Sequence, residues 1–274
     1  MSLNTNFGLD GATPSKLQDP DHPFSVIQGS QAGIVCLQEV LYSNAWTHYL
    51  SDLMKKQFWE IFWPHTTAYY GSHGNAILIH KDLWAEIIST RVHYLSRSKL
   101  HENYPLLDIT GNRDRRVYEQ IRDDRYGTSA AEVVIEFNWR IFTLLSVQWP
   151  ISMGLQGEDS DLHRRASDKM AKLISEAAGT VIMAGDLNEI SSWLWIQRLR
   201  WKPEPWVGTL DFVEISDGTL SSQHPLVRKW ILWPDTQLDY LALGWQNSCD
   251  ITDVQTHEAG SDHLGVSAKI RLFK

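Results

Sequence analysis

Several polar residues capable of metal or phosphate chemistry follow apolar runs in this sequence. The run from Val181 to Ala184 leads into Gly185, and Asp186 and Asn188 come next, two positions apart. An apolar run of this kind predicts a buried strand. Side chains alternate along a strand, so Asp186 and Asn188 would point the same way. The pattern predicts a carboxylate and an amide at one edge of a sheet, where α/β folds usually bind ligands.

Comparable polar residues stand at the ends of other apolar runs. They are Asn4 and Asn6 near the start, Glu39 after residues 34–37, Gln148 after residues 144–147, Asp239, and the pair Asp262 and His263. Each would cost core stability if it were buried alone. Gathered at one rim, they would form a cation site beside an acid–base pair. Taken singly, a Gly-Asp-Leu-Asn segment is more typical of a turn, and a lone histidine is more typically structural, so only the combination indicates a site.

Strands and helices that could position these residues alternate along the whole chain. We expect strands over residues 2–7, 33–37, 58–63, 75–79, 87–95, 130–137, 141–147, 181–184, 212–215, 238–243 and 265–272. We expect helices over residues 24–29, 43–56, 162–178 and 191–200. The chain shows no repeat and no low-complexity linker, and 274 residues with 43% hydrophobic content can build one large core. We therefore expect a single domain over residues 1–274.

In the order and separation of its motifs, the sequence resembles the endonuclease/exonuclease/phosphatase superfamily, which shares the deoxyribonuclease-like fold. The matching segments are Ser2-Leu3-Asn4, Leu37-Gln38-Glu39, Gly74-Asn75-Ala76-Ile77-Leu78, Gly185-Asp186-Leu187-Asn188, Leu238-Asp239-Tyr240 and Ser261-Asp262-His263, and they span nearly the whole chain. The resemblance implies an α/β fold, a four-layer sandwich in which two mixed, mostly antiparallel sheets pack face to face with helices outside. It also implies a divalent-metal-dependent hydrolase acting on phosphoesters.

By this resemblance Glu39 is the main ligand of Mg²⁺ or Mn²⁺, and Asn4 and Asp262 assist through their oxygens or through bound water. Mg²⁺ prefers carboxylate oxygens, keeps several waters and bridges to substrate phosphate. Asp186 would orient or deprotonate the attacking water. Asn188 would hold that water or a non-bridging phosphate oxygen.

The resemblance also implies that Asp239 and His263 form an oriented pair. The carboxylate would favour the protonated imidazole, which could stabilise the transition state or protonate a leaving group. Gln148 stands where many members carry His or Tyr, and it can donate a hydrogen bond to phosphate but cannot titrate. Asn6 stands where nucleases of the family often have Asp, and Leu3 replaces the usual Trp. These departures leave the subfamily open.

The function we expect is in-line hydrolysis of a phosphodiester in nucleic acid, by an endonuclease or an exonuclease. Two alternatives stay open: a phosphatase or phospholipase-type member acting on a small phosphoester or lipid headgroup, and a binding protein that kept the fold and lost turnover. The net charge of −8 argues against a non-specific nucleic-acid coat. The segment 96–126, with its run Arg113-Asp114-Arg115-Arg116, is either a solvated loop or an insertion whose arginines meet phosphate.

The remaining features concern location. No segment approaches 18 consecutive apolar residues, so we expect no membrane span. Met1 leads directly into Ser2-Leu3-Asn4 without a basic and apolar leader, so we expect no signal peptide. Cys36 and Cys249 form no CxxC motif and are expected to be small buried apolar groups, which suits a reducing compartment. We therefore expect a cytoplasmic or otherwise intracellular protein, and we also expect a monomer.

Overall fold

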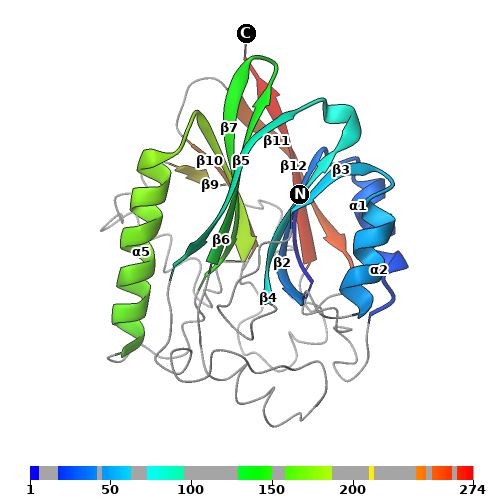
Figure 1. Ribbon diagram of the computed structural model, residues 1–274, viewed down its shortest axis with the longest axis horizontal. Coiled ribbons are helices and arrows are strands. Elements are labelled where there is room, and N and C mark those ends of the chain that lie inside the picture. The colour runs from blue at the N-terminus through cyan, green and yellow to red at the C-terminus, as the bar shows by residue number, and fades with distance from the viewer. Residues whose placement is uncertain are drawn as a thin grey trace.

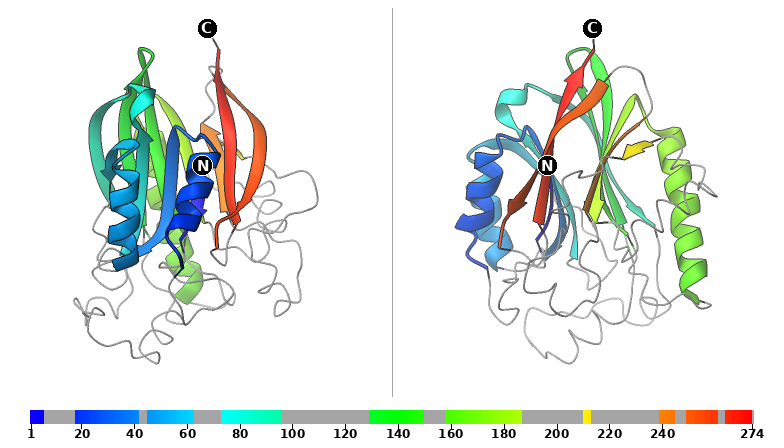
Figure 2. Two further views of the ribbon diagram at one scale, coloured as in Figure 1. Left: turned by 90° about the vertical axis from the view of Figure 1, so that its right-hand side faces the viewer. Right: turned by 180° about the vertical axis from the view of Figure 1, so that it is seen from behind.

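The computed structural model describes residues 1–5, 18–41, 45–62, 73–95, 129–149, 158–186, 210–212, 239–244, 249–260 and 264–273. Within these ranges two six-stranded sheets lie face to face, and helices lie on their outer sides (Figures 1 and 2). The strand orders are β11-β12-β1-β2-β4-β3 and β5-β6-β7-β8-β10-β9. Both sheets are mixed and mostly antiparallel, because β1–β2 and β7–β8 are the parallel pairs. The expected four-layer sandwich is confirmed.

The first sheet carries two helices on its outer face. Its strands are β1 (Ser2–Asn4), β2 (Ile34–Leu41), β3 (Phe58–Phe62), β4 (His73–His80), β11 (Cys249–Glu258) and β12 (Leu264–Leu272), and its helices are α1 (Asp21–Gly29) and α2 (Ala45–Met54). Leu3, Leu37 and Leu78 point to this outer face and pack in one buried cluster with Ile27 of α1 and Leu50 of α2. Burying these apolar side chains attaches the helices to the sheet.

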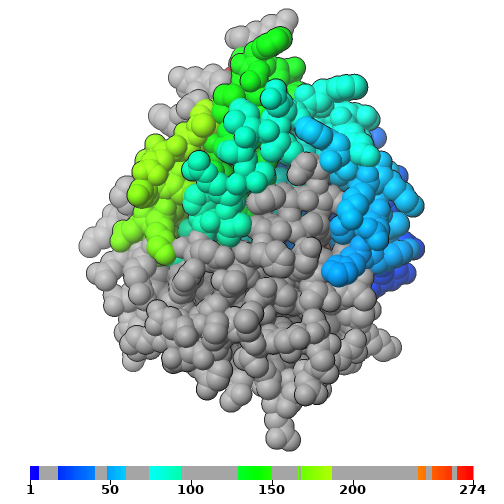
Figure 3. All heavy atoms as spheres, viewed as in Figure 1, coloured from blue at the N-terminus to red at the C-terminus, as the bar shows by residue number. Residues whose placement is uncertain are grey.

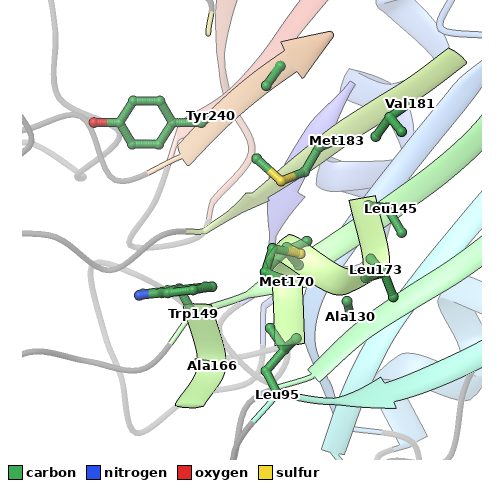
Figure 4. Packing of buried hydrophobic residues seen from close by; sticks show 12 residues of the cluster. Leu95, Ala130, Leu145, Trp149, Ala166, Met170, Leu173, Val181, Met183 and Tyr240 are labelled. Carbon is green, nitrogen blue, oxygen red and sulfur yellow. The ribbon is translucent and has the colours of Figure 1, made fainter. Parts of the chain in front are cut away.

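The second sheet carries α5 on its outer face. Its strands are β5 (Glu86–Tyr94), β6 (Ser129–Phe137), β7 (Arg140–Gln148), β8 (Thr180–Asp186), β9 (Leu210–Phe212) and β10 (Asp239–Gly244); α5 spans Glu158–Glu176, and a 3₁₀ turn, η2, spans Lys81–Leu83. Met170 and Leu173 of α5 pack on Leu145 and Val181 in a buried cluster that also holds Trp149 (Figure 4). The parallel pair β7 and β8 needs a long crossover, and α5 belongs to it. In the space-filling view of the same side, β5 lies between α5 and α2 (Figure 3).

The expected elements match these bounds closely, except that one strand was not expected. β11 was not expected, because residues 249–258 are polar and half-exposed and give no apolar run. Among the described strands β11 lies at the edge of its sheet and pairs with β12, so pairing rather than burial maintains it. The helix expected over 191–200 and residues 213–215 of an expected strand lie outside the described residues. None of the described helices combines the length and apolar character needed to cross a membrane.

The layer between the two sheets is apolar along most of its length and polar at one end. Cys36 on β2 and Ala184 on β8 belong to the apolar cluster between the sheets. Two positions further along each strand the inward positions hold Gln38 and Asp186, both fully buried. Every second residue of a strand points to the same face, so Gln38 and Asp186 point into the space between the sheets, as Cys36 and Ala184 do. Gln38 and Asp186 belong to a polar rim where β2 ends and β4 begins, at the lower ends of the strands in Figure 1.

Candidate active site at the rim of the two sheets

Asp186 lies at the centre of this polar rim. It ends β8 and has no exposed surface. Its Oδ2 accepts a hydrogen bond from Asn4 Nδ2 at 2.9 Å and another from Gln148 Nε2 at 3.3 Å. Asn4 ends β1 in the first sheet and Gln148 ends β7 in the second, so one carboxylate oxygen connects the two sheets. A buried carboxylate requires such donors, because water no longer solvates it.

Gly185 allows Asp186 to reach this position. A Cβ atom added at Gly185 would lie 2.2 Å from the carbonyl oxygen of Val147 on the neighbouring strand. No other residue can pass the β7 backbone this closely without moving it. The Trp149 backbone N–H also donates to the Asp186 carbonyl at 2.8 Å, which keeps β7 and β8 paired up to the rim.

Glu39 reaches the rim through a β-bulge. The register of β2 against β4 shifts between Leu37 and Val40, and Glu39 has a φ of 54°. A positive φ in a glutamate is strained and is typical of functional sites, and a bulge redirects the side chain that it carries. Thr5 Oγ1 lies 3.0 Å from the Gln38 carbonyl oxygen and 3.1 Å from that of Glu39, so its hydroxyl can donate to the bulge. The Glu39 side chain is half-buried.

Gln148 joins the two acids. Its Nε2 donates to Glu39 Oε1 at 3.2 Å as well as to Asp186 Oδ2. Ionised carboxylates only accept hydrogen bonds, so the NH₂ group must face them and the carbonyl oxygen Oε1 must point away. Gln148 is 5% exposed, and its buried Oε1 has no hydrogen-bond partner within the described part of the chain.

A second layer of polar residues supports the rim and was not expected as part of the site. Ser2 Oγ donates to Gln38 Oε1 at 3.2 Å, Gln38 Nε2 donates to Ser146 Oγ at 3.1 Å, and Ser146 Oγ donates to the Leu37 carbonyl at 3.0 Å. Ser2, Gln38 and Ser146 are fully buried. The signal in the sequence was their alternation along the strands. Ser2 stands two positions before Asn4, Gln38 stands two positions after Cys36, and Ser146 stands two positions before Gln148. This network connects the sheets directly behind Glu39.

Asn75 makes a further connection between the sheets and was also not expected as a site residue. Its Nδ2 donates to the Ser129 carbonyl at 2.8 Å and lies 3.3 Å from Ser129 Oγ. Asn75 is on β4 in the first sheet and Ser129 begins β6 in the second. Asn75 is 1% exposed, and its Oδ1 has no hydrogen-bond partner among the described residues.

The remaining expected site residues are placed only in part. Strand pairing sets Asp239 at the register position opposite Asp186. Asn6, Asn188, Asp262 and His263 lie outside the described residues, as does the arginine-rich segment 96–126.

The start of β12 lies near the rim. β12 begins at Leu264, directly after His263, and runs antiparallel to β1 with Val266 opposite Ser2. The start of β12 therefore lies at the end of β1 that carries Asn4.

The donor atoms at the rim suit a hard cation. Across the described ranges no group of three or more His, Cys, Asp or Glu side chains forms a complete metal cage. The rim offers carboxylate oxygens from Glu39 and Asp186 and amide oxygens from Asn75 and Gln148, without sulfur or imidazole from the described residues. Mg²⁺ typically takes one or two carboxylates and keeps several waters, so these residues fit Mg²⁺ or Mn²⁺. Glu39 would hold the ion, together with Asn4 and with Asp262 from outside the described residues.

Cys36 lies behind the rim but takes no part in its chemistry. Its thiol is buried between the sheets, and burial raises the pKa of this thiol to about 11, although the nearby Met1 ammonium group acts in the opposite direction. A protonated buried thiol is not a nucleophile. Cys249 is half-exposed rather than buried, so the expectation for this second cysteine was wrong; it begins the edge strand β11.

Comparison with known proteins decides the family. The model of a family described as "Endonuclease/Exonuclease/phosphatase family" matches residues 1–263. This chain belongs to that family. A search of curated proteins finds no match.

Solved structures of the endonuclease/exonuclease/phosphatase family share the fold. One from Beutenbergia cavernae aligns with a TM-score of 0.66 and 15% identity over 99% of this chain and 70% of that chain. D. rerio TDP2, solved in a complex with single-stranded DNA product, aligns with a TM-score of 0.64 and 14% identity over 98% of this chain and 97% of that chain. A mannosyl-6-phosphatase from Bacteroides thetaiotaomicron aligns with a TM-score of 0.59 and 14% identity over 99% of this chain and 98% of that chain. At such identities the likeness establishes the fold, and the rim residues of this chain must carry any statement about chemistry.

Proposed function

We propose that this chain is a divalent-metal-dependent hydrolase of phosphoesters that cleaves a phosphodiester in nucleic acid. The observation that supports it most is the convergence at the rim: Gln148 Nε2 contacts both Glu39 and Asp186, and Asn4 contacts Asp186. These residues come from both sheets and from the start and the middle of the chain. A carboxylate for a cation and a carboxylate for a water therefore lie next to each other.

Asp186 acts on the attacking water. Two amide donors on its Oδ2 fix the carboxylate, and we assign this carboxylate to hold or deprotonate the water. The fixed carboxylate keeps the water in line with the scissile phosphate, which supplies much of the rate through orientation. Glu39 holds the cation, which when bound supplies positive charge to the phosphate oxygens.

Residues outside the described ranges complete the proposal. Asn188 donates to a phosphate oxygen or to the water. His263, oriented by Asp239, holds a proton that stabilises the transition state or passes to the leaving oxygen. The register of Asp239 opposite Asp186 is compatible with this arrangement.

Nucleic acid is the substrate class that we favour. A small phosphoester is a second candidate within the same family. The structural likeness to a TDP2 solved with single-stranded DNA product supports a nucleic-acid substrate. The likeness to a mannosyl-6-phosphatase supports the second candidate, a phosphatase acting on a small phosphoester. Both use the same rim, so the substrate panel must separate them.

The test is Mg²⁺-dependent hydrolysis by the full chain. The panel contains single-stranded DNA, abasic duplex DNA, RNA, bis-p-nitrophenyl phosphate, an inositol phosphate and a sugar 6-phosphate. We expect turnover on a nucleic acid that EDTA abolishes, and Asp186→Asn should lower kcat by a factor of about 10³. The matched control is Asp168→Asn, because Asp168 is an exposed carboxylate on α5. Turnover of the sugar phosphate alone would favour the second candidate, and no turnover on any substrate would indicate a binding protein.

A further inference from the structure

Two amide side chains at the rim carry buried carbonyl oxygens that no described residue satisfies. They are Gln148 Oε1 and Asn75 Oδ1. Neither amide can simply be flipped: the NH₂ group of Gln148 faces two carboxylates and that of Asn75 faces the Ser129 backbone carbonyl, and none of these partners can donate. Both oxygens are therefore true acceptors. Each is buried without compensation until a donor arrives.

Both amides lie beside Glu39. Gln148 does so by direct contact, with its Nε2 3.2 Å from Glu39 Oε1. Asn75 does so by strand pairing, because β4 residues Ala76 and Gly74 pair with Leu37 and Val40, on the two sides of the bulge that carries Glu39. The two acceptors thus come from opposite sheets: Gln148 contacts the Glu39 side chain through its NH₂ group, and Asn75 stands on the strand paired with the bulge that carries Glu39.

The chemistry of the missing donor follows from the acceptors. The non-bridging oxygens of a phosphodiester carry no proton at neutral pH, so the phosphate of the proposed substrate cannot satisfy a carbonyl oxygen. Water bound to a divalent cation is a strong donor, since the cation polarises its O–H bonds. Mg²⁺ also keeps several waters when one or two carboxylates bind it, and those waters need acceptors.

We propose that Asn75 and Gln148 are outer-sphere positioning residues, whose carbonyl oxygens accept hydrogen bonds from the waters of a divalent cation held by Glu39. This inference rests on the metal requirement of the proposed function and adds a selectivity to it. The rim recognises a hydrated ion, so it favours Mg²⁺, which dehydrates reluctantly, over Ca²⁺, which takes more protein oxygens directly.

Calorimetric titration of Mg²⁺ and of Ca²⁺ into the full chain tests the inference without an activity assay. Asn75→Leu and Gln148→Met remove one acceptor each at similar volume, and Asn75→Leu leaves both hydrogen bonds of Gln148 in place. We expect each variant to weaken Mg²⁺ binding by about tenfold, the usual effect of losing an outer-shell partner, and to change Ca²⁺ binding much less. Thr143→Val is the matched control: Thr143 is buried on β7 at the end away from the rim, where its Oγ1 donates to the Ala178 carbonyl. It should bind both ions as the wild type does.

The outcomes separate the two proposals. Equal losses for Mg²⁺ and Ca²⁺ would mean that the amides only orient Glu39, and wild-type Mg²⁺ affinity in both variants would overturn the inference directly. In either case Glu39→Gln should still abolish binding, which would leave the proposed function intact. A wild-type chain that binds no Mg²⁺ would overturn both. Melting temperatures measured without metal identify a variant that fails to fold, and the other variant then decides.

Discussion

Gln148 and Glu39 belong to different sheets and are 109 positions apart in the chain, yet Gln148 Nε2 lies 3.2 Å from Glu39 Oε1. The contact connects Glu39, which we assign to the cation, with β7, the strand that lies next to β8 and its last residue, Asp186. A neutral amide is well suited to this place, because it can donate to two carboxylates at once without adding charge. Gln148 is therefore the side chain that connects the two acids of the rim.

Replacing Gln148 with glutamate should show this dependence. The substituted carboxylate would face Glu39 and Asp186 without a proton to donate, so we expect the free energy of unfolding to fall by about 2–4 kcal/mol in metal-free buffer. Mg²⁺ would neutralise the three acids, so it should raise the melting temperature of Gln148→Glu more than that of the wild type. Differential scanning calorimetry with Mg²⁺ and with EDTA measures both effects. The same Mg²⁺ shift in the two proteins would contradict the prediction.

Gly185→Ala should destabilise the fold strongly, because the added Cβ would lie 2.2 Å from the Val147 carbonyl oxygen. We expect a loss of about 3 kcal/mol, as for severe overpacking. Gly29→Ala is the control: Gly29 ends α1, and no atom lies within 4 Å of a Cβ added there. It should change stability by about 1 kcal/mol at most, toward greater stability. Urea unfolding of the three proteins checks this, and similar midpoints for the two variants would show that β7 and β8 can separate freely.

The two cysteines should differ in reactivity. Burial raises the pKa of the Cys36 thiol to about 11, so at pH 8 only about one molecule in a thousand carries the reactive thiolate at this position. Cys249 is half-exposed at the start of β11. Iodoacetamide labelling followed by mass spectrometry should modify Cys249 first and Cys36 only after denaturant is added. Equal rates in the native protein would mean that the space between the sheets opens readily.

His257 should make stability depend on pH. Burial lowers the pKa of His257 below its ordinary value of 6.5, and the Met1 ammonium group lowers it further. The folded state then resists protonation, so below pH 6.5 the unfolded state binds the proton more readily. This contribution to stability is complete above pH 6.5 and is lost as the pH falls from 6.5 toward the lower pKa of the folded state.

The variant His257→Gln removes the titrating group and can still contact Ser267, whose Oγ lies 2.6 Å from His257 Nε2. Urea unfolding at pH 7.5, 6.0 and 5.0 should show that the variant loses less stability than the wild type on acidification. Parallel losses in the two proteins would show that His257 is not the group responsible.

Most elements and the identity of the central acids could be predicted from the sequence, because both depend on local periodicity. Apolar runs marked the strands that end in Gln148 and Asp186, and the hairpin of β6 and β7 was expected around its polar turn. Asn138 and Trp139 have φ values of 50° and 62°, as a two-residue hairpin turn requires. The edge strand β11 was missed, because its pattern is polar and its partner determines it.

The sequence by itself determined which residue types could do the chemistry and on which strands they stand, because alternation along a strand is a property of neighbouring residues. Only the tertiary structure decided how they meet. Asn4 and Asp186 are 182 positions apart, and their contact depends on how the two sheets pack. The bulge at Glu39 breaks the alternation from which its direction would be predicted. The amide of Gln148 faces the two acids because carboxylates from both sheets reach it, and no local pattern specifies partners that only the packing of the sheets brings together.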